Sequence, residues 1–335
     1  MQLIDEKPLM ISEIHLKGFL DGKDMLILSK MSKYGNLRIL DMSGVTELNV
    51  FELYKLDDGE CSGNHIPFYE NDRLEEVIFP NVETIDALMF VKCYKLRKVV
   101  IPKTLKRLGD EILSVCPNVE EIYVSSDLDF DFSNYYESLC FPNNSFMGSG
   151  KRFVSDNEGW PKDVESDCFF AYDGVLYQVE GDGVGLYRYP AGDERTEFVI
   201  PDGVENICEY AFFKNRHLKS ITISSSVESF EENSFEKCHA LETVIFKHES
   251  FRKYYQIGLK KLPSLKHIYL YAEDPKEVCF DMFNGLDNLG EVTLHVPRAC
   301  KKKYEEFEVE HHRRGREKSY LRFHHIEEFD KENID

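Results

Sequence analysis

The sequence has no long hydrophobic run. No stretch approaches the ~18 consecutive apolar residues of a membrane-spanning helix, so we expect none. The first residues, MQLIDEKPLMISEI, include Asp5 and Glu6 and lack the apolar core of a signal peptide. The chain is therefore either cytosolic or begins after a removed leader.

Basic residues are scarce. The chain of 335 residues has 41 Lys and Arg against 61 Asp and Glu, which gives a net charge of −20. A protein that binds duplex nucleic acid needs a basic surface, and a protein that adsorbs to an anionic membrane needs one too. The sequence predicts neither class and instead favours solubility and basic partners.

Catalytic and metal-binding motifs are also missing. There is no His-Glu-x-x-His, no Gly-x-Ser-x-Gly and no Cys-x-x-Cys. The glycines at 181, 183 and 185 lie between two predicted strands with no helix start beside them, so they indicate a hairpin turn and not a phosphate cradle. We therefore expect no enzyme activity and no cofactor.

Two sequence patterns resemble parts of metal-binding sites, but neither is complete. Asp127, Asp129 and Asp131 alternate like the first half of a calcium loop, but Phe132 stands where that loop needs Gly, and Ser138 stands in place of the closing Glu. The adjacent pairs His311–His312 and His324–His325 point their rings in different directions on a helix or a strand. The sequence predicts no metal site.

A short phrase recurs throughout the chain: Leu, two variable residues, an aliphatic residue, one variable residue and another aliphatic residue. Consecutive copies are 22 to 24 residues apart wherever they are regular. A period in this range indicates stacked units of a solenoid. The copies begin at Leu37, Leu74, Leu96, Val119, Arg195, Leu218, Leu241, Leu265 and Leu289.

Each copy predicts one coil made of a short strand, a turn, an irregular arc and a second turn. Positions 4 and 6 alternate with polar residues, as in Val244 and Phe246, which indicates a half-buried strand. One coil cannot bury its own apolar edge, so stacked coils form a continuous core with strands paired in parallel. Cys93, Cys116 and Cys238 fall at one repeat position, and we expect a column of buried thiols there.

These residues resemble the BspA-type leucine-rich repeat. The resemblance is carried by the segments 200–218, 223–241 and 101–119, which share an Ile-Pro or Ile-Ser start, a Val, aromatic or aliphatic residues, a Cys and a final Leu or Val. LKGFLDGKDMLILSKM from Leu16 and LHVPRACKKKYEEF from Leu294 resemble the terminal modules of that family. The resemblance implies an α/β solenoid, a right-handed leucine-rich-repeat superhelix with a parallel concave sheet. It also implies a surface or secreted protein with a binding, often adhesive, role.

We expect one continuous solenoid domain with five parts. Residues 1–36 form an N-terminal cap, 37–125 and 195–295 form regular repeats, 126–194 form irregular repeats with an inserted β-hairpin, and 296–335 form a C-terminal cap. The expected irregular elements are helices at Asp24–Lys33 and Ala299–Glu310, a helix in the arc 248–263, and strands at Val175–Val179, Leu186–Tyr189 and Tyr320–Ile326.

Positions 3, 5 and 7 of each phrase point away from the core, so they line the outer face of the sheet. The last two copies place two tyrosines and two histidines there, with another tyrosine further along. Large amphipathic rings on an open surface are typical of binding hot spots. The competing interpretation is that the hairpin or the C-terminal cap folds over these rings and buries them. The predicted anchors are Tyr123, His267, Tyr269, Tyr271 and His295.

The sequence therefore predicts a monomeric, non-catalytic module that binds a protein partner, such as an extracellular host protein, through the concave sheet. A surface or secreted adhesin-like role follows from the resemblance. The alternatives are a glycan-binding surface protein, which would use stacking on the exposed rings, and a cytosolic interaction scaffold. An enzyme site in residues 126–194 ranks last, because no paired nucleophile and base occur there.

Overall fold

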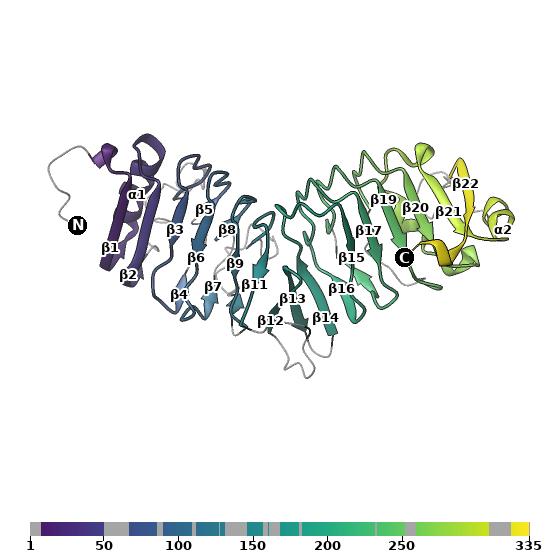
Figure 1. Cartoon of the computed structure of the whole chain (residues 1–335), viewed down its shortest axis with the longest axis horizontal. Helices are drawn as coiled ribbons and strands as arrows, with labels where there is room; N and C mark the ends of the chain where they lie inside the picture. The colour runs from purple at the N-terminus through teal and green to yellow at the C-terminus, as the bar shows by residue number, and fades with distance from the viewer. Residues whose placement is uncertain are drawn as a thin grey trace, which may run out of the picture. The chain divides into compact units, whose positions relative to one another are not determined.

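The computed structural model divides the chain into two compact units (Figure 1). Unit 1 is Met1–Gln178 with Pro190–Gly192, and unit 2 is Val179–Tyr189 with Asp193–Asp335. The residues that the structure describes are 8–49, 67–85, 90–108, 112–126, 128–130, 146–156, 160, 168–180, 183–231, 233–251, 259–307 and 323–334. Each unit is a stack of coils, so the predicted parallel-sheet solenoid is confirmed.

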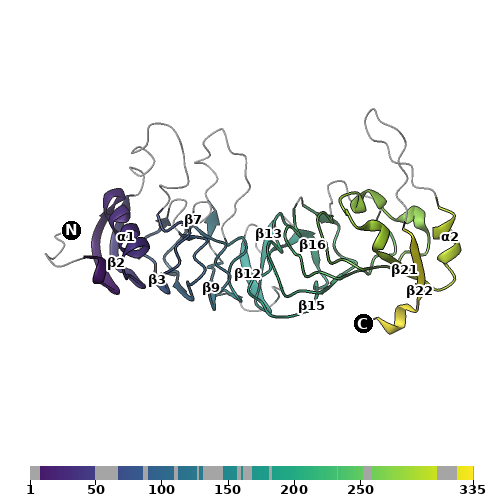
Figure 2. The ribbon, with the colours of Figure 1, turned by 90° about the horizontal axis from the view of Figure 1, so that it is seen from above.

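Unit 1 begins with a cap in which a strand precedes the predicted helix. Strand β1 (Glu13–Asp21) follows the short helix η1 (Pro8–Met10) and pairs in parallel with β2 (Ile39–Asn49). Helix α1 (Gly22–Tyr34) connects the two strands and lies beside them in Figure 2. The helix lies where the sequence predicts it, but β1 is not predicted, because its apolar residues do not alternate cleanly.

The main sheet of unit 1 continues from β2 through β3 (Glu76–Ile78) to β6 (Lys98–Val100), all in parallel and in register. One coil later, β9 (Ile122–Tyr123) pairs in parallel with β11 (Phe153–Val154). The return arcs carry two further small sheets. Their strands are β4 (Thr84–Ile85), β5 (Phe90–Val91), β7 (Arg107–Leu108), β8 (Leu113–Ser114) and β10 (Asp129–Phe130).

The core of unit 1 follows the repeat phrase. Leu74, Val77 and Phe79 are almost fully buried, and so are their counterparts in the next two coils. Cys93 and Cys116 are buried at the predicted repeat position, and each thiol donates to a carbonyl of the preceding coil, Phe68 O at 3.2 Å and Phe90 O at 3.5 Å. The column of thiols therefore connects neighbouring coils as well as filling space.

The two strands predicted for the β-hairpin are present and are neighbours in one sheet, and one further strand precedes them. Strand β12 (Phe169–Tyr172) pairs antiparallel with β13 (Val175–Glu180) around a two-residue turn of Asp173 and Gly174. Both turn residues have positive φ, as a tight hairpin turn requires. The predicted strands 175–179 and 186–189 correspond to β13 and to β14 (Gly183–Arg188), whereas β12 was missed. Gly181 lies outside the described residues.

Unit 2 contains a six-stranded parallel sheet. Its order is β15 (Glu197–Val199), β17 (Ser220–Ile223), β19 (Thr243–Phe246), β20 (His267–Leu270), β21 (Thr293–Pro297) and β22 (His325–Phe329). On the return arcs, β14 pairs with β16 (Val204–Ile207) and β16 pairs with β18 (Ser229–Phe230), again in parallel. Short helices complete the unit: η3 (Pro275–Glu277), η4 (Phe280–Phe283), η5 (Leu289–Glu291), α2 (Lys301–Glu305) and η6 (Lys331–Asn333).

Three expectations for the end of unit 2 need correction. Leu289 does not begin a strand phrase: it lies in η5 and is partly exposed, and the register pairs His267 with Thr293, two residues beyond the predicted partner. The last strand, expected near residues 320–326, is His325–Phe329 and lies within the segment FHHIEEF, and residues 320–322 are outside the described part of the chain. Within the described residues the cap helix covers only Lys301–Glu305. Residues 252–258 of the predicted arc helix lie outside the described part of the chain.

Candidate functional site

One row of residues crosses the outer face of the six-stranded sheet of unit 2. The inward neighbours Ile221, Val244 and Ile268 are fully buried in the core, so the residues that alternate with them face outward. Parallel register then aligns one outward residue from each strand. We call this set the central row: Val199, Thr222, Ile245, Tyr269, His295 and Glu327.

The central row changes in exposure along its length. Val199 is 54% exposed, whereas the exposed fractions of Thr222, Ile245 and His295 are only 5%, 8% and 7%. Neighbouring strands lie only about 4.8 Å apart, so β-branched and ring side chains in register cover one another. The row is therefore a tightly covered apolar strip with a polar, aromatic end at β20–β22.

The aromatic end is held together by ring contacts. Tyr269 stacks on His295 with ring centroids 4.1 Å apart and planes 8° apart. Phe329 of β22 meets Tyr269 edge-on at 5.3 Å and tilts against Tyr271 at 5.4 Å. One face of the Tyr269 ring is thus already occupied by His295, and burial, with Glu327 nearby, raises the pKa of the Tyr269 phenol. Tyr269 stays protonated at neutral pH and remains a hydrogen-bond donor.

The C-terminal segment covers part of this face. The Tyr271 hydroxyl lies 3.2 Å from the carbonyl of Lys331 and 2.9 Å from that of Ile334, and donates to them. The Lys331 ammonium lies 5.8 Å from the centre of the Tyr271 ring and 3.4 Å from a Glu273 carboxylate oxygen. The competing interpretation from sequence therefore applies in part: the cap contacts Tyr269 and Tyr271, which like His267 are half-buried, and His295 is buried.

Two imidazoles meet on neighbouring strands at this end. His267 Nδ1 lies 3.0 Å from His295 Nε2, and His295 Nδ1 lies 3.8 Å from a carboxylate oxygen of Glu327. Burial, followed by the neighbouring His267, lowers the pKa of His295, although Glu327 acts in the opposite direction. His295 is therefore neutral at physiological pH.

Tyr123, the fifth predicted anchor, belongs to unit 1 and makes none of these contacts. It lies on β9 with the Lys103 ammonium 5.4 Å from its ring centre. The outward residues of the preceding coils of unit 1 are Ile78 and Val100, the latter 39% exposed. Unit 1 therefore presents its own apolar strip, which includes Tyr123 and continues to its register partner Val154 of β11.

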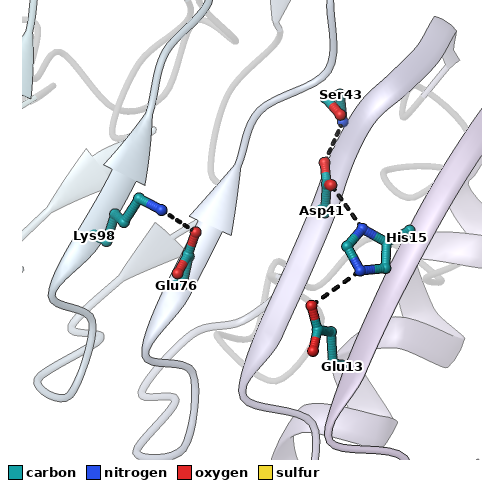
Figure 3. A network of polar contacts seen from close by, with 6 residues as sticks. All are labelled: Glu13, His15, Asp41, Ser43, Glu76 and Lys98. Carbon is teal, nitrogen blue, oxygen red and sulfur yellow. Dashed lines mark hydrogen bonds and ion pairs between the residues drawn. The ribbon is translucent and has the colours of Figure 1, made fainter.

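A polar network occupies the first strands of unit 1 (Figure 3). His15 Nδ1 lies 2.7 Å from an Asp41 carboxylate oxygen, and His15 Nε2 lies 2.9 Å from one of Glu13. Asp41 also accepts a hydrogen bond from the backbone N–H of Ser43 at 2.8 Å. Further along the same sheet, Lys98 pairs with Glu76. The sequence analysis did not single out His15, because its two partners come together only through the β1–β2 register.

The structure thus brings together four of the five predicted anchors and adds residues that the sequence did not indicate. Phe329 and Glu327 join the site because β22 begins later than predicted. Ile245 and Thr222 hold outward positions of the repeat phrase, as the sequence predicts, and the structure adds that both are buried there. The FHHIEEF segment and the spacing of the repeat phrase contain these four residues. Only the strand register shows which of their side chains become neighbours.

Among the described residues, no group of three or more His, Cys, Asp or Glu side chains is arranged to hold a metal ion. Asp129 lies in β10, whereas Asp127 and Asp131 are outside the described part of the chain, as are His311 and His312. His324 immediately precedes β22 and His325 is its first residue. No helix in the described ranges is both long enough and apolar enough to cross a membrane.

Comparison with family models gives one match. The model described as "BspA type Leucine rich repeat region" matches six copies over residues 64–149 and 189–302, which is more than half of the chain. The matched ranges contain the strands that form the central row, apart from β22, and the interruption between them contains the hairpin. No curated protein matches the sequence.

The chain also shows similarity to several solved structures. A leucine-rich cell surface protein from Faecalibacterium prausnitzii A2-165 is 20% identical, with a TM-score of 0.46, over 78% of this chain and 61% of its own, so the chain spans less than two thirds of that protein. A leucine-rich repeat protein from Eubacterium ventriosum is 16% identical, with a TM-score of 0.46, over 86% and 74%. The pneumococcal vaccine antigen PcpA is 17% identical, with a TM-score of 0.35, over 79% and 75%.

Proposed function

Because this chain belongs to the BspA-type leucine-rich repeat family, we propose that it is a non-catalytic module that binds a protein partner through the outer face of its parallel sheet. The central row of unit 2 is the proposed docking surface, with Tyr269, His267, Tyr271 and His295 at its aromatic end. Tyr123 marks a second contact region on unit 1.

One observation carries this proposal. Val199, Thr222, Ile245 and Tyr269 lie in register on four neighbouring strands and form an uncharged strip on a chain with a net charge of −20. Interface centres are poor in charged residues and rich in aromatic ones, and a few buried rings contribute most of the binding energy. Ion pairs flank the strip, such as Lys266 with Glu242 at 2.7 Å, as the polar rim of an interface would.

The test is a set of alanine variants in a binding titration. Tyr269→Ala should weaken partner binding by about 2 kcal/mol, the size of a hot-spot effect. Tyr94→Ala is the matched control, because Tyr94 is 45% exposed on a turn of unit 1 and belongs neither to the central row nor to the strip around Tyr123. Thermal unfolding of both variants checks that the fold is retained. Equal affinity of the wild type and Tyr269→Ala would remove the proposal.

For the compartment we propose the cell surface or the secreted fraction, where the adhesin-like role implied by the family resemblance would act. Family membership supports this placement. Protease treatment of intact cells tests it, because a surface-exposed chain is digested while a cytoplasmic control protein survives. Survival of the chain under those conditions would favour the cytosolic scaffold instead.

A further inference from the structure

The contact between His267 and His295 limits how many protons the pair can hold. His267 Nδ1 and His295 Nε2 are 3.0 Å apart, a hydrogen-bond distance, and the ring centres are 5.2 Å apart. A hydrogen bond between two ring nitrogens needs one N–H donor and one unprotonated acceptor. If both rings are imidazolium ions, each nitrogen carries a proton and the contact cannot form. The observed geometry therefore belongs to a pair that has at most one of its two rings charged.

The surroundings of the pair offer little compensation for a second charge. From β22, Glu327 faces His295 at 3.8 Å with a side chain that is 66% exposed, and His325 stands opposite Thr293 in the row of His267. From β20, the uncharged Tyr269 ring covers His295. On the side of β19, Glu242 is already paired with Lys266. A doubly protonated pair would thus meet one exposed carboxylate and a third imidazole.

We propose that His267 and His295 form a proton-operated switch in the docking surface. The pair shares a single N–H···N bond, and Tyr269 stacks on the His295 ring. A first added proton makes the pair cationic and leaves this bond in place. A second added proton breaks the bond, and the two like charges push the rings apart and disturb the Tyr269 stack. This inference rests on the proposed function, because it concerns the regulation of the same surface.

The expected consequence is binding that weakens in acid. A partner that docks against uncharged rings loses its complementary surface when charge appears beneath it. Histidine is the side chain whose ordinary pKa places this change between pH 5 and 8. The occupant of the surface at neutral pH is thus a protein with an apolar contact patch, released on acidification.

The test uses the full chain without any partner. Wild-type protein with labelled imidazole carbons is titrated by NMR, alongside His295→Asn and the control His239→Asn, which changes an exposed histidine of the same unit. Two interacting sites titrate in coupled macroscopic steps, so the ring signals of His267 and His295 should both report the same two steps. In His295→Asn, His267 should titrate in a single step, whereas His239→Asn should match the wild type.

Independent single-step titrations of His267 and His295 in the wild type would overturn the switch. If His295→Asn does not fold, His267→Asn replaces it, because His267 is the less buried member of the pair. The titration tests the switch, and the binding assay tests the docking surface, so each claim can be contradicted without the other. Coupled titration with no effect of Tyr269→Ala contradicts the docking surface alone, whereas uncoupled titration with weakened binding in Tyr269→Ala contradicts the switch alone.

Discussion

At the scale of single residues, the position within the repeat phrase determines whether a side chain is buried in the core or exposed on the sheet. Leu241 is fully buried at the first position of its phrase, while Val199 is the fifth residue of its phrase and more than half exposed. Both are aliphatic, so composition does not separate them. The difference arises because consecutive residues of a strand point to opposite faces of the sheet.

Replacing Leu241 should show this difference. Leu241→Ala leaves a cavity between two coils and should lower the free energy of unfolding by about 2–5 kcal/mol. Val199→Ala removes methyl groups from an exposed side chain and should change stability by no more than about 0.5 kcal/mol. Thermal and urea denaturation of the two variants provide the measurement. Similar losses from both would show that the inward and outward faces are wrongly assigned.

His15 illustrates how neighbours on a second strand set a charge. Its hydrogen bonds to Asp41 and then to Glu13 raise the pKa of the imidazole. Hydrogen bonds from the Ser43 side chain, and less strongly from its backbone N–H, hold the pKa of Asp41 below its ordinary value. A histidine with a raised pKa in the folded state stabilises the fold at pH below its ordinary pKa. That contribution is lost as the pH rises through the raised value.

We expect Asp41→Asn to lower the pKa of His15 toward its ordinary value, because the largest cause of the shift is removed. NMR titration of the His15 ring measures the change. His217, an exposed histidine of unit 2, serves as the internal control and should titrate identically in both proteins. An unchanged His15 titration midpoint would show that the network in Figure 3 does not persist in solution.

At the scale of elements, local signals were enough for the helix of the N-terminal cap. The Asp21 side chain accepts hydrogen bonds from the backbone N–H groups of Lys23 and Asp24, and the Asp24 carboxylate accepts one from the backbone N–H of Asp21. This reciprocal capping fixes the start of α1 directly after β1. The boundary between strand and helix is thus specified by two carboxylates.

Asp21→Ala should therefore destabilise the cap by about 1 kcal/mol, the usual cost of losing an N-cap side chain. Hydrogen exchange of the α1 amides measures the change locally. Asp21→Asn is the matched control, because Asn caps helices about as well as Asp and should retain most of the protection. Equal exchange rates in Asp21→Ala and the wild type would contradict this account.

The strand register of the last coils could not be predicted from the local sequence pattern. The segment NLGEVTLH matches the repeat phrase, but Leu289 lies in η5 and the strand therefore pairs two residues later than predicted. A shift of two keeps the same faces, so His295 still points outward, but it stands beside Tyr269 and not beside Tyr271. The fold and four of the five anchors could be assembled from sequence, whereas their pairwise contacts required the three-dimensional pairing of β20, β21 and β22.

At the scale of the whole molecule, each unit is held together by contacts between neighbouring coils. The parallel pairings connect each strand to the next coil, and the buried Cys238 thiol donates to the carbonyl of Phe212 in the coil before it at 2.8 Å. The stability of such an array is approximately a sum of coil and nearest-neighbour terms. Local damage should therefore remain local.

Hydrogen exchange can test this property across the chain. In Leu241→Ala, amides of β17, β19 and β20 should lose protection, because these strands border the cavity, while amides of β3 and β6 in unit 1 should exchange as in the wild type. A uniform loss of protection in both units would contradict nearest-neighbour stabilisation.

The central claim is that a partner covers the outer face of the sheet of unit 2. Hydroxyl-radical footprinting of the free and partner-bound chain tests it most directly, because the method reports the solvent access of individual side chains. We predict that Tyr269 and Val199 become protected in the complex while Tyr94 reacts at the same rate in both states. Unchanged reactivity of Tyr269 and Val199 in a saturated complex would contradict the account.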